Sequence, residues 1–250
     1  MKDNALIELK GLTKRYGRQV AVDNLTLDIK EGEIFCFLGP NGAGKTTTIL
    51  MLLGLTEPTS GTVNVCGFNP TRDALKVKRF IGYLPENVGF YGDMTARQNL
   101  HYVAQLNGVP HDQIAAKVDE ALRILELEGE AEKRVDAYSR GMRQRLGIAE
   151  LLIKDPRIIF LDEPTMGLDP DGANRMIELI KTLRQEKKMT ILLSSHNLPQ
   201  VQKLSDRVCI MIKGRLVALG PIQELAKKKV GVDQERYTLE EIYMKYFQEV

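Results

Sequence analysis

A glycine-rich segment that ends in lysine and threonine is the part of the sequence best suited to chemistry. It reads Gly39-Pro40-Asn41-Gly42-Ala43-Gly44-Lys45-Thr46 and satisfies the pattern G-x-x-x-x-G-K-[ST]. The glycines let consecutive backbone N–H groups point at one anion, and the N-terminus of a following helix adds partial positive charge. Lys45 would reach the β and γ phosphates of a nucleotide, and Thr46 offers a hydroxyl to Mg²⁺. The pattern predicts a nucleoside triphosphate site and leaves kinases, GTPases and ATPases open. A dinucleotide fingerprint does not fit, because a lysine follows the last glycine.

Two adjacent carboxylates follow an apolar segment further along the chain, in Arg157-Ile-Ile-Phe-Leu-Asp162-Glu163-Pro164. At the tip of a strand, Asp162 would hold Mg²⁺ directly or through water. Glu163 points elsewhere because side chains alternate along a strand, so it is free to orient or deprotonate the water that attacks the γ phosphate. The alternative is an acidic loop exposed to solvent, which the presence of the phosphate loop disfavours.

A histidine and a capped helix offer two further contacts for a triphosphate. His196 follows the apolar segment Thr190–Leu193, so it should lie at the same sheet edge as Thr46 and Glu163, within reach of a γ phosphate. Ser139 is placed to cap a helix whose positive end could serve a second nucleotide. The simpler interpretation of Ser139 is a well-capped helix. His101 and His111 are interpreted as structural.

The elements that position these residues follow from the hydrophobic pattern. Continuously apolar segments predict strands buried on both faces, namely Glu33–Leu38, Arg157–Leu161, Thr190–Leu193 and Val208–Ile212. Alternating patterns at Ile7–Leu9 and Leu25–Ile29 predict half-buried antiparallel strands. Helical patterns lie between the buried segments, including Thr47–Leu53 and a helix that begins at Pro170. Strands alternating with helices predict an α/β fold with a mainly parallel sheet.

The middle of the chain, from about residue 86 to 154, lacks buried-strand patterns and is predicted to be a helical insertion. Thr95 and Gln98 form a capping-box pattern, a second helix is expected over Ile114–Leu127, and Ser139 opens a third. Beyond the core, Lys213-Gly214 predicts a hairpin turn into Arg215–Leu219.

Composition limits the functional class. The 250 residues carry 35 Lys+Arg and 33 Asp+Glu, a formal net charge of +2, which argues against a dedicated binder of nucleic acid or anionic membrane. No apolar run approaches the roughly 18 residues of a membrane span, and the first residues do not resemble a secretory signal. Three scattered cysteines, each beside apolar residues, are expected to be buried free thiols. The sequence therefore predicts a soluble cytosolic protein.

Taken in order, these motifs resemble those of the ATP-binding cassette (ABC) family of ATPases over essentially the whole chain. Walker A corresponds to Gly39–Thr46, Walker B to Arg157–Asp162, the catalytic glutamate to Glu163 and the switch histidine to His196. The signature sequence corresponds to Ser139–Met142 and the D-loop to Gly167–Pro170. The resemblance implies that ATP is contacted by the Walker A residues, Thr47, Ser139, Gly141, Met142 and Asp169, with Tyr16 stacked on adenine.

The resemblance also implies an architecture: a P-loop NTPase (RecA-like) core with an N-terminal antiparallel β-subdomain and an inserted helical subdomain. Residues 1–250 would form a single nucleotide-binding domain. The core with its β-subdomain would comprise about 1–85 and 155–220, the helical signature subdomain about 86–154, and a short C-terminal helical tail 221–250. Within that tail, Leu239–Tyr243 resembles the C-terminal helix of exporter cassettes.

The expected partners follow from the family. Two cassettes, either two copies or this chain with a related one, would sandwich ATP head to tail, at the cytoplasmic face of the cell membrane beside a polytopic permease. The segment from Gly82 to Leu100 resembles the exporter-type branch and would meet the permease. Its side chains Val88, Phe90 and Tyr91 are equally compatible with a core role. The alternative function is a soluble ABC ATPase in assembly or repair, and a regulatory module without turnover is disfavoured by the intact motif residues.

Two motifs depart from the family pattern. Glu86 occupies the position of the usual Q-loop glutamine, where a carboxylate could still approach Mg²⁺ or water. The signature, usually L-S-G-G-Q, is here Tyr138-Ser-Arg140-Gly-Met142. Ser139 and Gly141, the residues implied to contact the γ phosphate, are retained.

Overall fold

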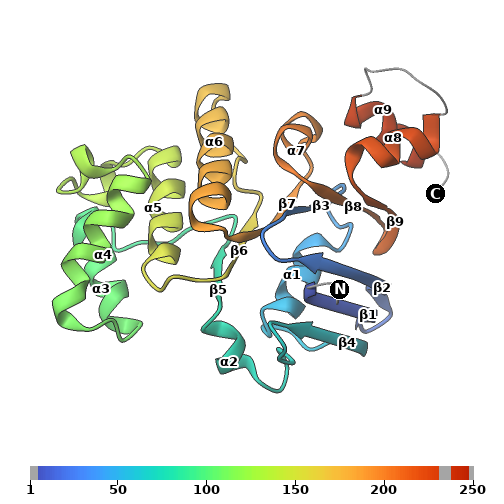
Figure 1. Cartoon of the computed structure of the whole chain (residues 1–250), viewed down its shortest axis with the longest axis horizontal. Helices are drawn as coiled ribbons and strands as arrows, with labels where there is room; N and C mark the ends of the chain where they lie inside the picture. Colours follow the sequence, from blue (N-terminus) through green and yellow to red (C-terminus); the bar gives the residue numbers. More distant parts are fainter. Residues whose placement is uncertain (1–4, 231–237, 248–250) are drawn as a thin grey trace.

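The computed structural model describes residues 5–230 and 238–247 and is built around two sheets (Figure 1). The larger has six strands, in the spatial order β5 (Ile81–Leu84), β6 (Ile158–Asp162), β7 (Thr190–Ser195), β3 (Ile34–Leu38), β8 (Arg207–Ile212) and β9 (Arg215–Gly220). The first five are parallel, and β9 returns antiparallel to β8 through the predicted turn at Lys213 and Gly214, both with positive φ. The parallel strands therefore all end at one edge, where ligands bind in open α/β sheets.

The smaller sheet is antiparallel and contains β2 (Gln19–Lys30), β1 (Ala5–Tyr16) and β4 (Ser60–Val65), in that order. It packs with helix α1 (Lys45–Leu52) over one face of the large sheet, in a core that contains Phe35 and Phe37 of β3. The alternate residues of β3, Ile34, Cys36 and Leu38, face the opposite core. Because β3 is buried on both faces, its sequence is apolar without interruption, as predicted.

The predicted helical stretch contains α3 (Ala96–Leu106), α4 (His111–Ile124) and α5 (Arg140–Leu152), with single 3₁₀ turns at Glu128–Glu130 and Val135–Ala137. These helices gather at one end of the molecule, away from the antiparallel sheet (Figure 1). The capping box at Thr95 and Gln98 is present, and Ser139 caps α5 by accepting a hydrogen bond from the Met142 N–H. The expected helix over 114–127 is displaced: it begins three residues earlier and stops at Ile124, because Glu126 takes a left-handed conformation with φ 54°.

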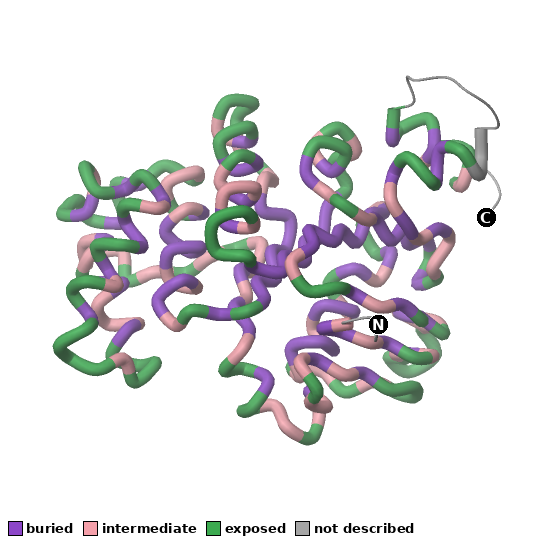
Figure 2. Tube along the Cα trace, viewed as in Figure 1, coloured by how far each residue is buried: buried purple, intermediate pink, exposed green. Residues whose placement is uncertain are grey.

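The remaining helices are α2 (Ala74–Lys78), α6 (Pro170–Lys187), α7 (Leu198–Leu204), α8 (Ile222–Val230) and α9 (Leu239–Phe247). Figure 2 shows the buried positions concentrated along the strands of the large sheet and on the inner sides of the helices. All three cysteines are free thiols, and Cys36 and Cys209 are buried in these cores as expected. Cys66 is only half-buried, because it lies in the turn that follows β4. Among the described residues, no helix is both long and apolar enough to pass through a bilayer.

Candidate functional site

The large sheet brings the phosphate loop, the carboxylate pair and the histidine to one edge, as predicted. At the ends of the strands, Leu38 of β3 pairs with Ser195 of β7, and Asp162 of β6 pairs with Ser194. The segments that leave these three strands are Gly39–Thr46, the turn after Glu163, and His196. Because these parallel strands are adjacent, residues more than 100 positions apart in the sequence lie together at one site.

The phosphate loop is packed so tightly that glycine is required at its first and last glycine positions. A Cβ at Gly39 would lie 2.2 Å from the Met211 carbonyl oxygen, and one at Gly44 would lie 2.5 Å from the Ala21 carbonyl oxygen. Gly44 also has φ 100°, which side chains rarely adopt. The loop also surrounds the lysine side chain: the Lys45 Nζ donates to the carbonyl oxygens of Gly39 at 2.7 Å and of Pro40 at 3.3 Å.

Lys45, Glu163 and His196 form one electrostatic cluster. The Glu163 Oε1 lies 3.3 Å from Lys45 Nζ and 3.0 Å from His196 Nδ1. The lysine and glutamate side chains are almost fully buried, whereas the histidine is half exposed. The same Oε1 is buried yet accepts no well-aligned hydrogen bond from the described residues. A buried carboxylate oxygen with unused acceptor capacity is suited to accept a proton or orient a water molecule.

The backbone of Glu163 contributes to this arrangement. Glu163 has φ 48°, in the left-handed region that non-glycine residues adopt mainly at turns and functional sites. Its N–H is held by the Ser194 carbonyl and hydroxyl oxygens at 3.2 and 3.1 Å. Strand alternation predicted only that Glu163 points away from Asp162. The left-handed turn is what directs it towards Lys45.

Asp162 sits among hydroxyl groups. The Thr46 Oγ1 donates to its carboxylate at 3.1 Å, the Ser194 hydroxyl donates to Oδ1, and Tyr83 also forms a hydrogen bond with it. Burial, together with the charges of Asp162 and Glu86, raises the pKa of Tyr83 to about 12, so its phenol stays protonated and a donor. Ser194 and Tyr83 were not predicted as site residues; for Ser194, the polar end of an otherwise apolar strand was the available signal. Hydroxyl and carboxylate oxygens are the donors that Mg²⁺ prefers, so Thr46 and Asp162 fit that ion.

The predicted signature residues lie elsewhere in the chain. A cavity of about 300 Å³ is lined by the start of α5, the D-loop and the start of α6, including Ser139, Gly141, Met142 and Asp169. Asp169 caps α6 by accepting from the Gly172 N–H. Among the described residues, no hydrogen bond or ion pair joins this group to Lys45 or Glu163. The predicted signature residues and the Lys45–Glu163 cluster therefore lie in separate places within this chain.

Tyr16 and Glu86 lie at the periphery. Tyr16 ends β1 with half of its surface exposed, and the Lys14 Nζ lies 4.8 Å from the centre of its ring. Glu86 is half-buried and lines a cavity of about 340 Å³ against the start of α5. No contact between the Glu86 carboxylate and Thr46 or Asp162 occurs among the described residues, so its role as a metal ligand stays a prediction.

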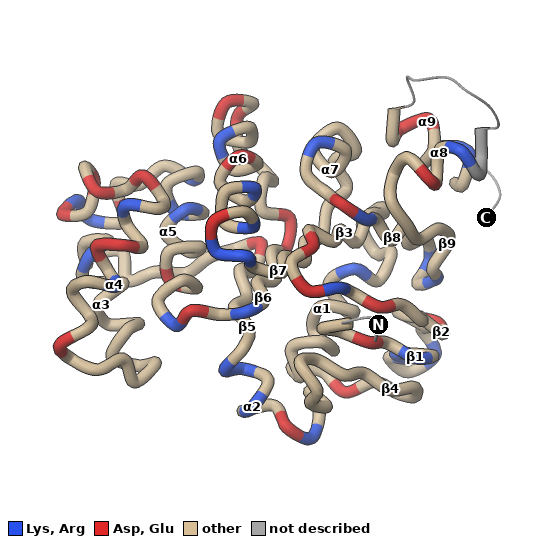
Figure 3. The backbone as a smooth tube through the Cα atoms, in the orientation of Figure 1, with Lys and Arg blue, Asp and Glu red and all other residues tan. Residues whose placement is uncertain are grey.

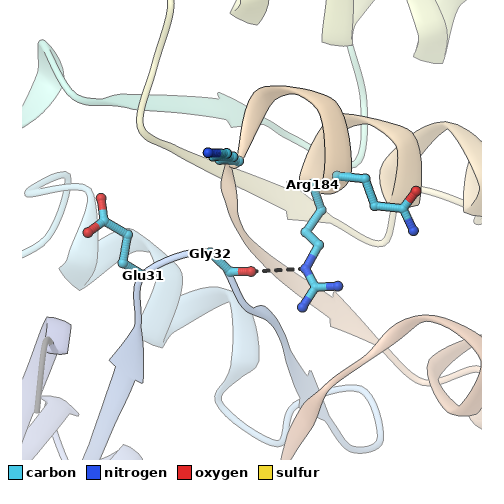
Figure 4. Close-up of a pocket in the computed structure, with 5 residues that line it drawn as sticks. Glu31, Gly32 and Arg184 are labelled. Carbon is cyan, nitrogen blue, oxygen red and sulfur yellow. Dashed lines mark hydrogen bonds between the residues drawn. The ribbon is translucent and has the colours of Figure 1, made fainter.

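A further pocket of about 480 Å³ opens at the opposite edge of the sheet, before β3, and Figure 4 shows its lining. There the Arg184 Nε donates to the Gly32 carbonyl at 3.0 Å, and Glu31 turns towards Arg157 at 2.6 Å. None of the predicted site residues lies in this pocket.

Known proteins resemble this chain over most of its length. The family model described as ABC transporter matches residues 22–166. The bacitracin transport ATP-binding protein BcrA of Bacillus licheniformis is 45% identical over 90% of this chain and 72% of its own length. A Nod factor export ATP-binding protein I of Cupriavidus metallidurans is 39% identical over 92% of this chain and 75% of its own.

Solved structures agree with the sequence relatives. CbiO1 from Clostridium perfringens, described as part of an ABC transporter complex, superposes with a TM-score of 0.83 at 25% identity, covering 99% of this chain and all of that one. An ATP-binding cassette solved as a dimer after hydrolysis, with ADP and Pi, gives a TM-score of 0.76 at 26% identity, over 86% of this chain and 98% of that one.

Proposed function

Because the chain belongs to the ABC transporter family and is an ATP-binding subunit with ATPase activity, we propose that it powers export through a separate membrane permease by ATP-driven closure of a dimer. The observation that carries the proposal is the cluster of Lys45, Glu163 and His196 around one buried carboxylate oxygen. A cation for phosphate, a base for water and a histidine at the rim are the parts that γ-phosphate hydrolysis needs.

Each residue of the cluster has a distinct task in this mechanism. Lys45 exchanges Glu163 for the β and γ phosphates, which frees the carboxylate to orient the attacking water. His196 hydrogen-bonds the γ phosphate from the solvent side. Thr46 and Asp162 would hold Mg²⁺, which when bound neutralises phosphate charge. The backbone N–H groups at the end of the loop, where α1 begins at Lys45, supply the remaining positive potential.

The separation of the two half-sites supports a dimer. Ser139, Gly141 and Met142 line a cavity apart from the phosphate loop, so one copy's signature helix completes the other copy's site in a head-to-tail pair. ATP bound between the halves stabilises the closed pair, and loss of the γ phosphate reopens it. Tyr16 supplies a ring face for adenine. The dimeric state of a similar cassette supports this arrangement.

The names of the relatives support an export role. BcrA is named for bacitracin transport, and the Nod factor relatives for export. We therefore place the chain at the cytoplasmic face of the cell membrane, attached to a polytopic permease that selects the cargo. Purification of the native chain from membranes together with one polytopic protein is the expected result. Recovery only in a soluble complex would instead favour a role in assembly or repair.

The dimer mechanism is tested by Glu163→Gln. The amide keeps the size of the side chain but cannot accept a proton, so we expect turnover to fall by about 10²–10⁴-fold while ATP binding persists. Sedimentation with ATP and Mg²⁺ should then reveal a stable dimer. The exposed carboxylate of Glu186 on α6 provides the control, and Glu186→Gln should hydrolyse ATP normally. A Glu163→Gln chain that stays monomeric with ATP would contradict the mechanism.

A further inference from the structure

The segment that leads into β5 is strongly cationic, although the chain as a whole is nearly balanced in charge. Residues 72–79, which include α2, carry four basic side chains and one acidic one, a net charge of +3 against +2 for the whole chain. The basic residues, all exposed to solvent, are Arg72, Lys76, Lys78 and Arg79. The balanced total charge therefore conceals one basic surface, and Figure 3 shows its basic positions along α2 and in the turn before it.

Most of this positive charge has no counter-ion within the chain. Lys76 pairs with Asp73 at 2.9 Å. In the part of the chain that the structure describes, the other three basic side chains form no hydrogen bond or ion pair. The Lys154 Nζ donates to the Lys78 carbonyl oxygen at 3.2 Å and so brings a fifth cation to this surface. Burial, together with the charge of Lys78, lowers the pKa of Lys154, which is the effect of like charges that gather in one place.

A leucine occupies the middle of this basic segment. Leu75 is 79% exposed, the highest value among the large apolar side chains that the structure describes, while Val77 anchors the helix in the core. A second leucine, Leu55, is 54% exposed. The turn that contains it packs on the turn before α2, since a Cβ at Gly54 would lie 2.4 Å from the Pro70 carbonyl oxygen. Exposed leucines among lysines and arginines are typical of surfaces that enter the headgroup region of a membrane.

The basic surface lies away from the nucleotide edge of the large sheet. The Phe80 carbonyl oxygen, directly after residues 72–79, accepts from the N–H groups of Arg157 and Ile158 at the start of β6. The surface is therefore at the edge where the parallel strands begin, opposite the edge that carries Lys45. Figure 1 shows α2 at the periphery of the molecule. Because β5 has four residues, about 13 Å of strand separates this surface from the segment that is predicted to meet a permease.

We propose that this surface, residues 72–79 together with Leu55, binds an anionic phospholipid bilayer, with Leu75 entering the interface between headgroups and acyl chains. The long apolar stems of lysine and arginine let their charges reach lipid phosphates while the leucine is buried. An acidic protein would satisfy the charges alone, whereas a bilayer interface satisfies both the charges and the exposed leucine. The contact is additional to the permease and does not require it, so it goes beyond the proposed function.

Co-sedimentation of the purified, nucleotide-free chain with lipid vesicles tests the charges. The chain should bind phosphatidylcholine vesicles that contain about 30% phosphatidylglycerol and should not bind phosphatidylcholine alone. Replacing two unpaired cations, in a chain with Lys78→Gln and Arg79→Gln, should lower the partition coefficient about 25-fold, or about fivefold for each charge. Salt at about 0.5 M should abolish the binding.

A chain with Arg123→Gln and Lys203→Gln is the matched control for charge. Both side chains are exposed, on α4 and α7, and their replacement changes the net charge by the same amount. This control should bind anionic vesicles as tightly as the parent does. If the two double variants lost binding equally, the total charge and not residues 72–79 would be responsible, and the proposal would be overturned.

Tryptophan fluorescence tests the position of the leucine. The chain contains no tryptophan, so the indole introduced by Leu75→Trp would be the sole reporter. Its emission should shift to the blue on anionic vesicles and be quenched by brominated acyl chains. Leu106→Trp is the control: Leu106 is 68% exposed, but residues 98–116 contain no lysine or arginine, so its emission should not shift. An unshifted emission from the Leu75→Trp chain on vesicles would overturn the proposal.

A soluble polyanion distinguishes an acidic protein from a membrane. Leu75→Ala should weaken binding to anionic vesicles about three- to tenfold, because less apolar surface enters the interface. If poly-glutamate bound the chain as tightly as the vesicles do, and Leu75→Ala weakened neither complex, the partner would be an acidic protein and the proposal would fail. ATP hydrolysis in solution should be the same in the parent and in every variant. Loss of vesicle binding by a chain that still hydrolyses ATP therefore rejects this inference and leaves the proposed function intact.

Discussion

Buried charges occupy both edges of the large sheet, and the two edges use them differently. Where the parallel strands end, the Glu163 Oε1 lies near two cations without a well-aligned hydrogen bond, on a backbone with φ 48°. Where the strands begin, the Glu33 Oε1 accepts from the Lys30 N–H at 2.8 Å and from Arg207 at 3.0 Å. Figure 3 shows acidic and basic positions along both edges.

The Glu33 and Glu163 carboxylates differ in how many hydrogen-bond partners they have and in which elements those partners connect. Arg207 also donates to the Asp28 carbonyl and lies over the Phe35 ring, so it joins β2 of the small sheet to β8 of the large one. Its partners are all within the chain. Lys45 and Glu163 neutralise each other, but the Glu163 Oε1 keeps an acceptor capacity that no described group fills. Charges with complete coordination fix the fold, whereas incompletely coordinated ones are available for chemistry.

The largest effect at the functional edge is expected for Lys45→Ala. Removing the ammonium takes away the cation that binds the β and γ phosphates, so ATPase turnover should fall by at least about 10²–10³-fold, with a matching loss of ATP affinity. Titration with a fluorescent ATP analogue and a phosphate-release assay measure both. Lys181→Ala, on the surface of α6, should change neither. If the Lys45→Ala chain hydrolysed ATP at the parent rate, the ATPase site could not lie at this edge of the sheet.

At the opposite edge, Arg207→Met should affect stability and leave ATP binding unchanged. The substitution leaves Glu33 buried without its cation, and breaking a buried pair costs about 3–5 kcal/mol. Urea denaturation of the ATP-free chain measures the loss. Lys10→Met, which breaks an exposed pair with Glu8 at 3.2 Å, is the control and should cost less than about 1 kcal/mol. If Arg207→Met also abolished ATP binding in the folded chain, the two edges would not be independent.

The same contrast explains what could be predicted from the sequence. The phosphate loop, the carboxylate pair and His196 were correctly placed at one edge, because each follows a buried strand and parallel strands end together. That inference needs only local patterns and a topological rule. The free thiols, the Thr95 capping box and the Lys213-Gly214 turn were likewise local and confirmed.

What the sequence did not indicate depends on tertiary contacts. Strands β4 and β5 are only partly apolar, since β4 is at a sheet edge and β5 has four residues, so their patterns are short. The left-handed Glu163 is fixed by Ser194 on a neighbouring strand, which no local pattern reports. Glu86 and Arg140 appeared as separate departures from a family pattern. Only the fold places them on one cavity.

The smallest expected effect is on the pH dependence of stability. It tests whether Arg207 and the Lys30 N–H fully offset the cost of burying the Glu33 carboxylate. Burial raises the pKa of Glu33, with the Lys30 N–H and Arg207 opposing the shift. The folded chain thus holds this proton to higher pH than the unfolded chain does. The stability that Glu33 contributes is therefore full below the unfolded pKa and is lost as pH rises through the folded pKa.

Glu33→Gln removes that titration, so the unfolding free energy of the parent minus that of the variant should decrease from about pH 4.5 towards neutrality. Chemical denaturation of both chains across this range gives the difference directly, and pH effects common to both chains cancel. A difference that rises with pH would mean that Arg207 outweighs the desolvation of Glu33. The Glu33–Arg207 pair would then stabilise the fold at neutral pH, because its hydrogen bonds and ion pair would outweigh the cost of burying the Glu33 carboxylate.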